Sequence, residues 1–280
     1  MLVLLNERFV PEEEAVISVF DRGFLYGDGL FETIKVFNGN PFRWSEHFER
    51  FRRGADFLGI ELPFASGPLL ELARELVRKN EARDALMRVM VSRGVGLRGY
   101  SPRGAKRPTW VISTHVGSGG GEEMRQWRLQ SSSVRLPANE PLAQFKTCNK
   151  LAQIISRTQA DAAKADEALL LNTDGFVVEG SSSNLFWIKD DIIHTPPLAS
   201  GILAGVTRSV VKEISADLGV STRECNVVPE QILEADGVFL SLTSVGIAEA
   251  VALDDQPLKR SALSGRLHAA YWALLRKETL

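Results

Sequence analysis

Residues 145–208 read FKTCNKLAQIISRTQADAAKADEALLLNTDGFVVEGSSSNLFWIKDDIIHTPPLASGILAGVTR, and this stretch places three candidate functional groups on short successive elements. Residues Ala143–Thr147 predict a strand end, and Asn149 is a suitable N-cap for a helix whose apolar residues recur near helical spacing. Lys146 is therefore expected at a strand-to-helix junction, where an amine can face a pocket. Lys150 falls in the first helical turn, where the helix dipole opposes its charge, and is the weaker candidate. Either lysine also has a plain interpretation as a solvated surface charge.

A predicted hairpin follows this helix and delivers an acidic residue. Residues 168–171 are an apolar run typical of a buried strand, Asn172–Gly175 is a turn, and residues 176–178 form a second strand. Glu179 then stands at a strand end, on the margin of an apolar sheet. A carboxylate in that place is either a solvated edge charge or a paired functional group.

The third element is a loop of small residues, Ser200–Gly205, that leads into a helix. The apolar positions of the helix fall on one face, and they are Val206, Val210, Val211, Ile214 and Leu218. Gly219 is placed to end the helix. The backbone N–H groups at such a helix start bind phosphate or carboxylate groups, although most loop-to-helix joints are ordinary helix entries.

Two helices are expected earlier in the chain. The first is capped by Ser45, carries an apolar stripe and is ended by Gly59. The second extends from Ser66 to about Lys79, and its apolar stripe predicts core packing. Two strands are predicted between the second helix and residue 145, at residues 86–93 and 109–112.

Several short motifs occur along the chain, each at one place. They are Asp21-Arg22-Gly23, Tyr26-Gly27-Asp28-Gly29-Leu30-Phe31-Glu32, Glu46-His47-Phe48-Glu49-Arg50, Lys146-Thr147-x-Asn149, Glu179-Gly180-x-x-x-Asn184-Leu185-Phe186, Thr195-Pro196-Pro197 and Leu203-x-Gly205-x-Thr207-Arg208. Their combination resembles the fold type IV pyridoxal-phosphate enzymes, which comprise branched-chain aminotransferases, D-amino acid aminotransferases and aminodeoxychorismate lyases. The resemblance implies a two-domain α+β fold of the D-amino acid aminotransferase type, with a small N-terminal α/β domain and a larger, β-rich C-terminal domain that binds the cofactor.

The resemblance also assigns roles to single residues. Lys146 would be the catalytic lysine that binds pyridoxal 5'-phosphate covalently, and Glu179 would be the partner of the pyridine nitrogen. The cofactor phosphate would be held by Arg50, Val206, Thr207 and Thr243. The substrate would be bound by Phe31, Arg98 and Tyr100.

The segment between Ala85 and Gly121 contains no acidic residue. Its basic residues are Arg88, Arg93, Arg98, Arg103, Lys106 and Arg107. The loop between the two predicted strands, residues 94–108, is hereafter the basic loop and is expected to carry a locally positive surface. This surface is either simply solvated or attracts anions at the edge of a pocket. The wording Arg98-Gly99-Tyr100-Ser101-Pro102 is most similar to aminodeoxychorismate lyases, and D-amino acid aminotransferases use a related arginine here.

The length and composition limit the classes of protein to which the chain can belong. The chain has 280 residues and a net charge of -2, which suits a large core in one or two domains and argues against a dedicated nucleic-acid binder. Two cysteines and four scattered histidines give neither a disulfide framework nor metal-ligand spacing. No apolar run reaches membrane-spanning length and the apolar start is too short for a signal peptide, so we expect a cytoplasmic protein.

The glycine-rich stretch at residues 117–121 is expected to separate two domains. We place a small N-terminal domain at residues 1–116, a linker at 117–123 and a large cofactor-binding domain at 124–280.

The first functional interpretation is a pyridoxal-phosphate-dependent aminotransferase of branched-chain or D-amino acid type. It would move an amino group between an amino acid and a 2-keto acid, and would act as a homodimer. Two features depart from the family pattern. The Pro-Val pair that follows the Thr243 equivalent in many aminotransferases is missing from Ile247–Val251, and Phe31 stands where D-amino acid aminotransferases have a tyrosine. The alternative is therefore an aminodeoxychorismate lyase that forms p-aminobenzoate and pyruvate. A non-catalytic nucleic-acid-binding protein is a distant alternative, because the positive charge is confined to one loop.

Overall fold

The structure, a computed structural model, describes residues 1–117 and 122–280. By its internal packing the chain divides into two units, each of which is described by itself. The first unit comprises residues 1–119, 145–149 and 275–280, and the second comprises 120–144 and 150–274. Most of the linker expected at 117–123 lies outside the described residues, and the expected domain boundaries remain a prediction.

The first unit is built on an antiparallel sheet of six strands, in the order β2-β1-β6-β5-β3-β4. The strands are β1 (Leu2–Leu5), β2 (Arg8–Pro11), β3 (Gly29–Phe37), β4 (Asn40–Pro41), β5 (Ala85–Ser92) and β6 (Thr109–Val116). The β3–β4 hairpin turns at Asn38 and Gly39, both of which have positive φ, as a tight hairpin turn requires. The short β4 pairs only with the far end of β3, so the Gly29–Phe31 end of β3 is left open on that side.

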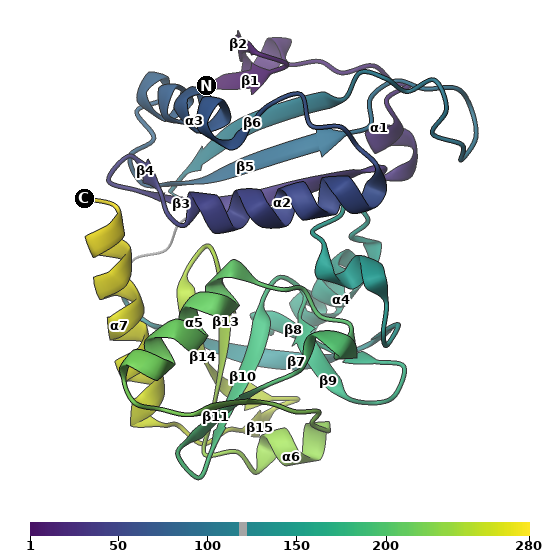
Figure 1. Cartoon of the computed structure of the whole chain (residues 1–280). Helices are drawn as coiled ribbons and strands as arrows, with labels where there is room; N and C mark the ends of the chain where they lie inside the picture. The colour runs from purple at the N-terminus through teal and green to yellow at the C-terminus, as the bar shows by residue number, and fades with distance from the viewer. Residues whose placement is uncertain (118–121) are drawn as a thin grey trace. The chain divides into compact units, whose positions relative to one another are not determined.

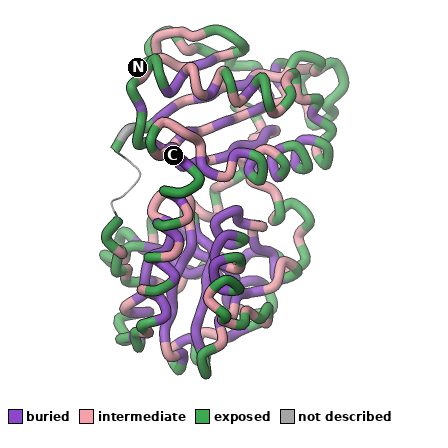
Figure 2. Tube along the Cα trace, turned by 60° about the vertical axis from the view of Figure 1, so that its left-hand side comes forward, coloured by how far each residue is buried: buried purple, intermediate pink, exposed green. Residues whose placement is uncertain are grey.

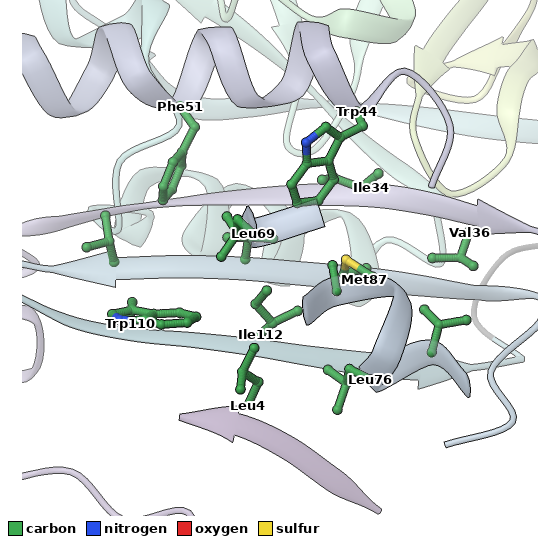
Figure 3. Packing of buried hydrophobic residues seen from close by; sticks show 14 of the residues in the cluster. Leu4, Ile34, Val36, Trp44, Phe51, Leu69, Leu76, Met87, Trp110 and Ile112 are labelled. Carbon is green, nitrogen blue, oxygen red and sulfur yellow. The ribbon is translucent and has the colours of Figure 1, made fainter. Parts of the chain in front are cut away.

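Helices α1 (Arg22–Tyr26), α2 (Trp44–Leu58) and α3 (Ser66–Lys79) complete this unit (Figure 1). Figure 3 shows the core in which α2 and α3 meet the strands, formed among others by Leu4, Ile34, Trp44, Phe51, Leu69, Leu76, Met87, Trp110 and Ile112. Every second residue of β5 is buried in this core, so the residues between them, including Arg88, face the opposite side of the sheet.

The expected start of α2 is wrong by two residues. The helix begins at Trp44 after Arg43, which adopts a left-handed conformation, and no side chain caps its first turn. Trp44 is buried and its indole Nε1 donates to Ser66 Oγ at 3.1 Å, so tertiary packing decides where this helix starts. Its end at Gly59, with φ of 64°, is confirmed.

The second unit is built on a sheet of nine strands, in the order β12-β11-β10-β13-β14-β7-β8-β9, with β15 paired to β14. The strands are β7 (Arg125–Leu136), β8 (Glu167–Asn172), β9 (Val177–Gly180), β10 (Asn184–Lys189), β11 (Ile192–Thr195), β12 (Thr222–Glu224), β13 (Gly237–Leu242), β14 (Gly246–Leu253) and β15 (Gln256–Pro257). A single pairing of Asn184 with Glu179 also joins β9 to β10, which closes six of these strands into a ring. Figure 2 shows long buried stretches through the middle of this unit and exposed residues mainly at its outer turns.

The remaining helices are α4 (Leu151–Ala162), α5 (Val206–Asp217), α6 (Pro229–Leu233) and α7 (Ala262–Glu278), and three short 3-10 turns are η1 (Glu12–Glu14), η2 (Pro141–Gln144) and η3 (Leu198–Ser200). The predicted β8–β9 hairpin is confirmed. Asn172 Oδ1 accepts the backbone N–H groups of Asp174 and Phe176, which fixes the turn. Together, these helices and sheets give the expected α+β class. In the part of the chain that is described, no helix combines the length and the apolarity needed to cross a membrane.

The segment before α4 differs from its prediction. Ala143–Thr147 was expected to be a strand end, but it contains the end of η2 and a single bridge from Thr147 to Leu30. Asn149 does not cap α4, because its side-chain Nδ2 donates to the Gly27 carbonyl at 3.1 Å instead. The open end of β3 therefore determines this conformation, by drawing the segment into backbone and side-chain hydrogen bonds.

Candidate active site

Lys146 lies in the first unit, in the short segment that pairs with the open end of β3. The Lys146 carbonyl accepts the Phe31 N–H at 2.9 Å. The N–H of Cys148, two residues further along the chain, donates to the Gly29 carbonyl at 2.9 Å. Gly27 is needed here, since a Cβ at this residue would lie 2.6 Å from Asn149 Oδ1. The backbone on both sides of Lys146 is thus held, which orients its side chain.

The Phe31 ring brings two cationic groups together. Lys146 Nζ lies 4.8 Å from the ring centroid and the Arg88 guanidinium carbon lies 3.9 Å from it, both within the range of a cation–π contact. Arg88 stands opposite Thr33 in the β3–β5 ladder, so it is a diagonal neighbour of Phe31 on the same face. Two positive groups at one apolar ring make a site suited to an anion.

Arg88 is half-buried, and burial lowers the pKa of its guanidinium. Its Nε contacts Met90 Sδ at 3.2 Å, and no carboxylate within the described ranges forms an ion pair with it. In the sequence, Arg88 is only one of the six basic residues between Ala85 and Gly121. The signal that identifies it is the strand register, which places Arg88 beside Phe31, combined with the absence of acidic residues from Ala85 to Gly121.

Arg50 lies against the opposite face of β3, where Glu32 points. Arg50 Nε and Nη2 donate to the two Glu32 oxygens at 2.7 and 2.6 Å, and His47 Nδ1 contacts Glu32 Oε2 at 2.7 Å. All three side chains are buried. The predicted phosphate role of Arg50 is not tested by this arrangement, which gives Arg50 a carboxylate partner.

Burial and charge act in opposite directions on these groups. Burial would raise the pKa of Glu32, but the Arg50 charge and the bonds from His47 and Arg50 outweigh it and lower the pKa to about 2. Burial lowers the pKa of His47, against the raising effect of Glu32, and the charges of Arg50 and Lys146 lower it further. At neutral pH the cluster therefore holds an ionised Glu32 and a neutral His47.

The two predicted substrate residues of the basic loop, Arg98 and Tyr100, lie beyond β5 with exposed side chains. Tyr100 is 88% exposed, and its ring makes an edge contact with the Tyr26 ring, at 5.7 Å between centroids. Phe31, the third predicted substrate residue, is buried.

Glu179 lies in the second unit and is buried at the end of β9. Its Oε2 accepts the backbone N–H of Leu203 at 3.0 Å. Asn184, directly opposite Glu179 across the ladder, donates from Nδ2 to the Leu203 carbonyl at 2.9 Å. The two side chains therefore hold the loop before α5 by both backbone groups of one residue.

The loop that Glu179 and Asn184 hold leads into α5, whose first residues are the predicted binding site for phosphate or carboxylate. Gly205 is the N-cap of α5, no side chain caps the helix, and Val206 and Thr207 are its first two residues. Their N–H groups have no acceptor within the helix, and the helix dipole makes this end attractive to an anion. Thr243 is half-buried in the turn after β13.

A second buried carboxylate supports the turn between β9 and β10. Glu167 is fully buried and accepts hydrogen bonds from the backbone N–H and hydroxyl groups of Ser181 and Ser182, and from the Ser183 hydroxyl. This turn joins Glu179 to Asn184. Glu167 is not among the residues predicted from the sequence, where its signal is an acidic residue beside the apolar run that begins at Ala168.

Each unit by itself supplies groups of the kind that pyridoxal phosphate needs. The first unit has an amine at Lys146, and the second unit has a buried carboxylate at Glu179 and an uncapped helix start beside Thr207 that can receive a phosphate. The residues present therefore fit the cofactor.

Comparison with known proteins gives the family. Residues 29–253 match the family model described as amino-transferase class IV. The chain is 36% identical over 255 residues to a Methanocaldococcus jannaschii protein named "Putative branched-chain-amino-acid aminotransferase", covering 91% of this chain and 88% of that one. It is 33% identical over 261 residues to Staphylococcus aureus D-alanine aminotransferase, covering 91% and 90%. The chain belongs to the class IV aminotransferases.

A solved structure agrees with this assignment. The branched-chain amino acid aminotransferase from T.th., solved with pyridoxamine 5'-phosphate, superposes with a TM-score of 0.92 at 32% identity, over 99% of this chain and 94% of that one. Class IV aminotransferases depend on pyridoxal phosphate, so the predicted family, cofactor and enzyme class are confirmed.

Proposed function

We propose that this enzyme transfers the amino group of an aliphatic amino acid to a 2-keto acid. The observation that carries the proposal is the Phe31 ring, where the Lys146 amine and the Arg88 guanidinium lie 4.8 and 3.9 Å from one centroid. An amino acid and a keto acid each carry a carboxylate beside the reacting carbon. Arg88 supplies a cation for that carboxylate close to the lysine, and the Phe31 ring supplies an apolar surface for an aliphatic side chain.

In this proposal, Lys146 holds the cofactor covalently and moves a proton at the α-carbon of the substrate. Glu179, a buried carboxylate, keeps a proton on the pyridine nitrogen. The N–H groups of Val206 and Thr207, with Thr243, hold the phosphate at the start of α5, and Arg50 adds a positive charge for it. When bound, the cofactor supplies the electron-withdrawing ring on which transamination depends.

The substrate carboxylate has two proposed cationic partners in the first unit. Arg88 is half-buried beside Lys146, and Arg98 is exposed on the basic loop together with Tyr100. A charge-assisted contact of this kind contributes roughly 1.5–3 kcal/mol to binding. Recognition of the carboxylate explains why the segment after Ala85 has arginines and no acidic residue.

The experiment is a half-reaction panel. The purified enzyme, loaded with pyridoxal phosphate, is mixed with single L- and D-amino acids, and the cofactor absorbance is followed before and after addition of a 2-keto acid. The proposal predicts loss of the starting spectrum with aliphatic amino acids and its recovery with the keto acid. Related proteins are named for branched-chain amino acids and for D-alanine, so the responding enantiomer decides between these two substrate types. A cofactor spectrum that no amino acid changes contradicts the proposal.

A second candidate is the release of pyruvate from aminodeoxychorismate. The observation that favours it is the loop Arg98-Gly99-Tyr100-Ser101-Pro102, which resembles the corresponding loop of aminodeoxychorismate lyases. Both substrates carry carboxylates, so the cationic groups do not separate the two reactions. Robust pyruvate release, without amino exchange that depends on a keto acid, assigns the lyase reaction instead.

We further propose that the enzyme is a homodimer in the cytoplasm. The first unit exposes a run of large apolar side chains, namely Val16, Ile17, Val19, Phe20, Phe24 and Leu25. A second copy that covers them would remove a patch of a kind that is uncommon on monomeric proteins. Cys148 and Cys225 are thiols that are not joined in a disulfide, which suits a reducing compartment.

A further inference from the structure

The backbone of the basic loop is organised around one buried side chain, that of Arg22 in α1. We propose that Arg22 is a positioning residue that holds the loop at Arg98–Ser101 in the shape that presents Arg98 to the substrate carboxylate. This inference rests on the proposed function, and it assigns to Arg22 a part in substrate recognition without any contact with the substrate.

The contacts are made to three successive carbonyl groups. Arg22 Nη1 donates to Gly99 O at 2.8 Å and to Ser101 O at 3.2 Å, and Nη2 donates to Tyr100 O at 3.1 Å. Residues 98–101 lie in no strand or helix, so their backbone groups need partners of another kind. A planar guanidinium with several donors can bind three carbonyls at once, which a lysine ammonium cannot do with the same geometry.

Arg22 is itself fixed from several directions. It is only 4% exposed, and its Nε donates to Asp28 Oδ2 at 2.7 Å. Asp28 also accepts from Arg93 Nε and Nη2 at 2.8 and 3.1 Å, and although burial would raise its pKa, the bonds from Arg93 and Arg22 lower it. The guanidinium lies 4.9 Å from the centroid of the Tyr26 ring. An ionised Asp28 thus orients the arginine that orients the loop.

Two further features match the loop to Arg22. Tyr26 accepts the Gly99 N–H at its hydroxyl at 3.1 Å, so the same short helix binds the loop twice. A Cβ at Gly96 would lie 3.0 Å from Arg22 Cδ and 3.1 Å from the Ala105 Cβ, so this glycine leaves room for the arginine. The loop backbone is held from within, while the side chains of Arg98 and Tyr100 remain exposed.

The test compares Arg22→Met with a matched control, Arg93→Met. Arg93 shares Asp28 with Arg22, but its remaining bonds go to the Leu58 and Gly59 carbonyls and not to the loop. Both variants are loaded with pyridoxal phosphate and assayed with an amino acid and with a simple amine that lacks a carboxylate. Deuterium exchange of the amide groups in residues 97–106 is measured in parallel.

We expect Arg22→Met to raise KM for the amino acid between about ten- and a hundredfold, because a misplaced binding group loses much of its effect. The expected change in kcat is smaller, KM for the amine stays the same, and the loop amides exchange faster. Arg93→Met is expected to leave loop exchange unchanged. An unchanged KM, or an equal rise for amine and amino acid, overturns the inference.

Two more variants keep the result interpretable. Arg22→Lys retains the positive charge beside Asp28 but loses the three-carbonyl contact, so it must show the same KM effect if Arg22→Met does not fold. Arg98→Ala tests the proposed function separately. If Arg98→Ala leaves KM unchanged while Arg22→Met still speeds loop exchange, the carboxylate role of the loop fails and the inference about substrate positioning fails with it.

Discussion

Phe31 and Glu32 are consecutive residues that serve opposite faces of β3. Because side chains alternate along a strand, Phe31 meets Arg88 and Lys146 on one side, and Glu32 meets Arg50 and His47 on the other. The first face combines two cationic groups with an apolar ring, and this combination can bind an anionic substrate. On the second face an ionised carboxylate is enclosed by hydrogen-bond donors, which stabilises the fold.

The first prediction concerns Arg88. Replacing it by leucine removes the cation beside the Phe31 ring and should weaken amino acid and keto acid binding by roughly ten- to a hundredfold. Arg88→Lys keeps the charge without the planar fork and should lose less. The measurement is KM for an amino acid and for an amine without a carboxylate. An equal loss for both compounds would show that Arg88 only supports the sheet.

The second prediction concerns acid stability. The pKa of Glu32 falls from 4.5 to about 2 on folding, which corresponds to about 3 kcal/mol of stability. A lowered pKa means that the unfolded chain binds more protons, so this contribution is present above pH 4.5 and is lost as the pH falls towards 2. His47, whose pKa is lowered from 6.5, adds a loss that begins near that pH.

Urea unfolding of wild type and Glu32→Gln between pH 7 and 3 measures this effect. The variant should be less stable at pH 7, because Arg50 is left buried without its carboxylate, and its stability should fall less steeply with acid. Glu49→Gln is the control, since the Glu49–Arg52 pair on α2 is exposed and should contribute little. Parallel pH profiles for wild type and Glu32→Gln would refute the assignment.

At the scale of elements, the sequence pattern is sufficient to predict a helix or hairpin where interactions between neighbouring residues decide the conformation. The α3 helix follows from its apolar stripe, and the β8–β9 hairpin follows from the Asn172–Gly175 turn between two apolar runs. The segment at residues 143–149 was predicted wrongly as a strand end and an N-cap, because its partners in β3 lie far earlier in the chain.

The same distinction applies to the candidate site. Lys146 and Glu179 can be named from motifs within a few residues of each. Arg88 could not be singled out in this way, because its position depends on the register between β3 and β5. Arg22 belongs to a recognised motif, but only the folded loop shows which carbonyls it binds.

The third prediction tests the start of α5. A Cβ at Gly205 would lie 2.0 Å from Asn184 Oδ1, so Gly205→Ala must disturb the Asn184 contact that holds Leu203. We expect a loss of about 1–3 kcal/mol in stability without cofactor and weaker binding of pyridoxal phosphate. Gly67→Ala is the control, since nothing lies within 4 Å of its Cβ. Equal unfolding midpoints and cofactor affinities in the two variants would contradict this account.

For the molecule as a whole, the family assignment rests on similarity along almost the full chain and on the fold of both units. The exposed apolar side chains call for a further explanation. They occur in the first unit around Phe20 and Phe24, and in the second unit on α4 at Leu151, Ile154 and Ile155. The proposed homodimer would cover residues of this kind, because large exposed apolar patches on a single chain mark interaction surfaces.

The fourth prediction is that light scattering gives twice the mass of the chain. Phe24→Asp should shift the enzyme towards the monomer, because a charge replaces a side chain that is 71% exposed in the single chain. Leu280→Asp, at an exposed apolar residue away from the Val16–Leu25 run, is the control and should not change the mass. A wild-type mass equal to one chain would rule out the dimer.

The most direct test of the central claim is to locate the cofactor. The enzyme is loaded with pyridoxal phosphate and treated with borohydride, which makes the covalent bond to the lysine permanent, and the modified peptide is then identified by mass spectrometry. Our account predicts a single adduct on Lys146, which is absent from Lys146→Ala and unchanged in Lys150→Ala. An adduct on Lys150, or one that survives in Lys146→Ala, would contradict it.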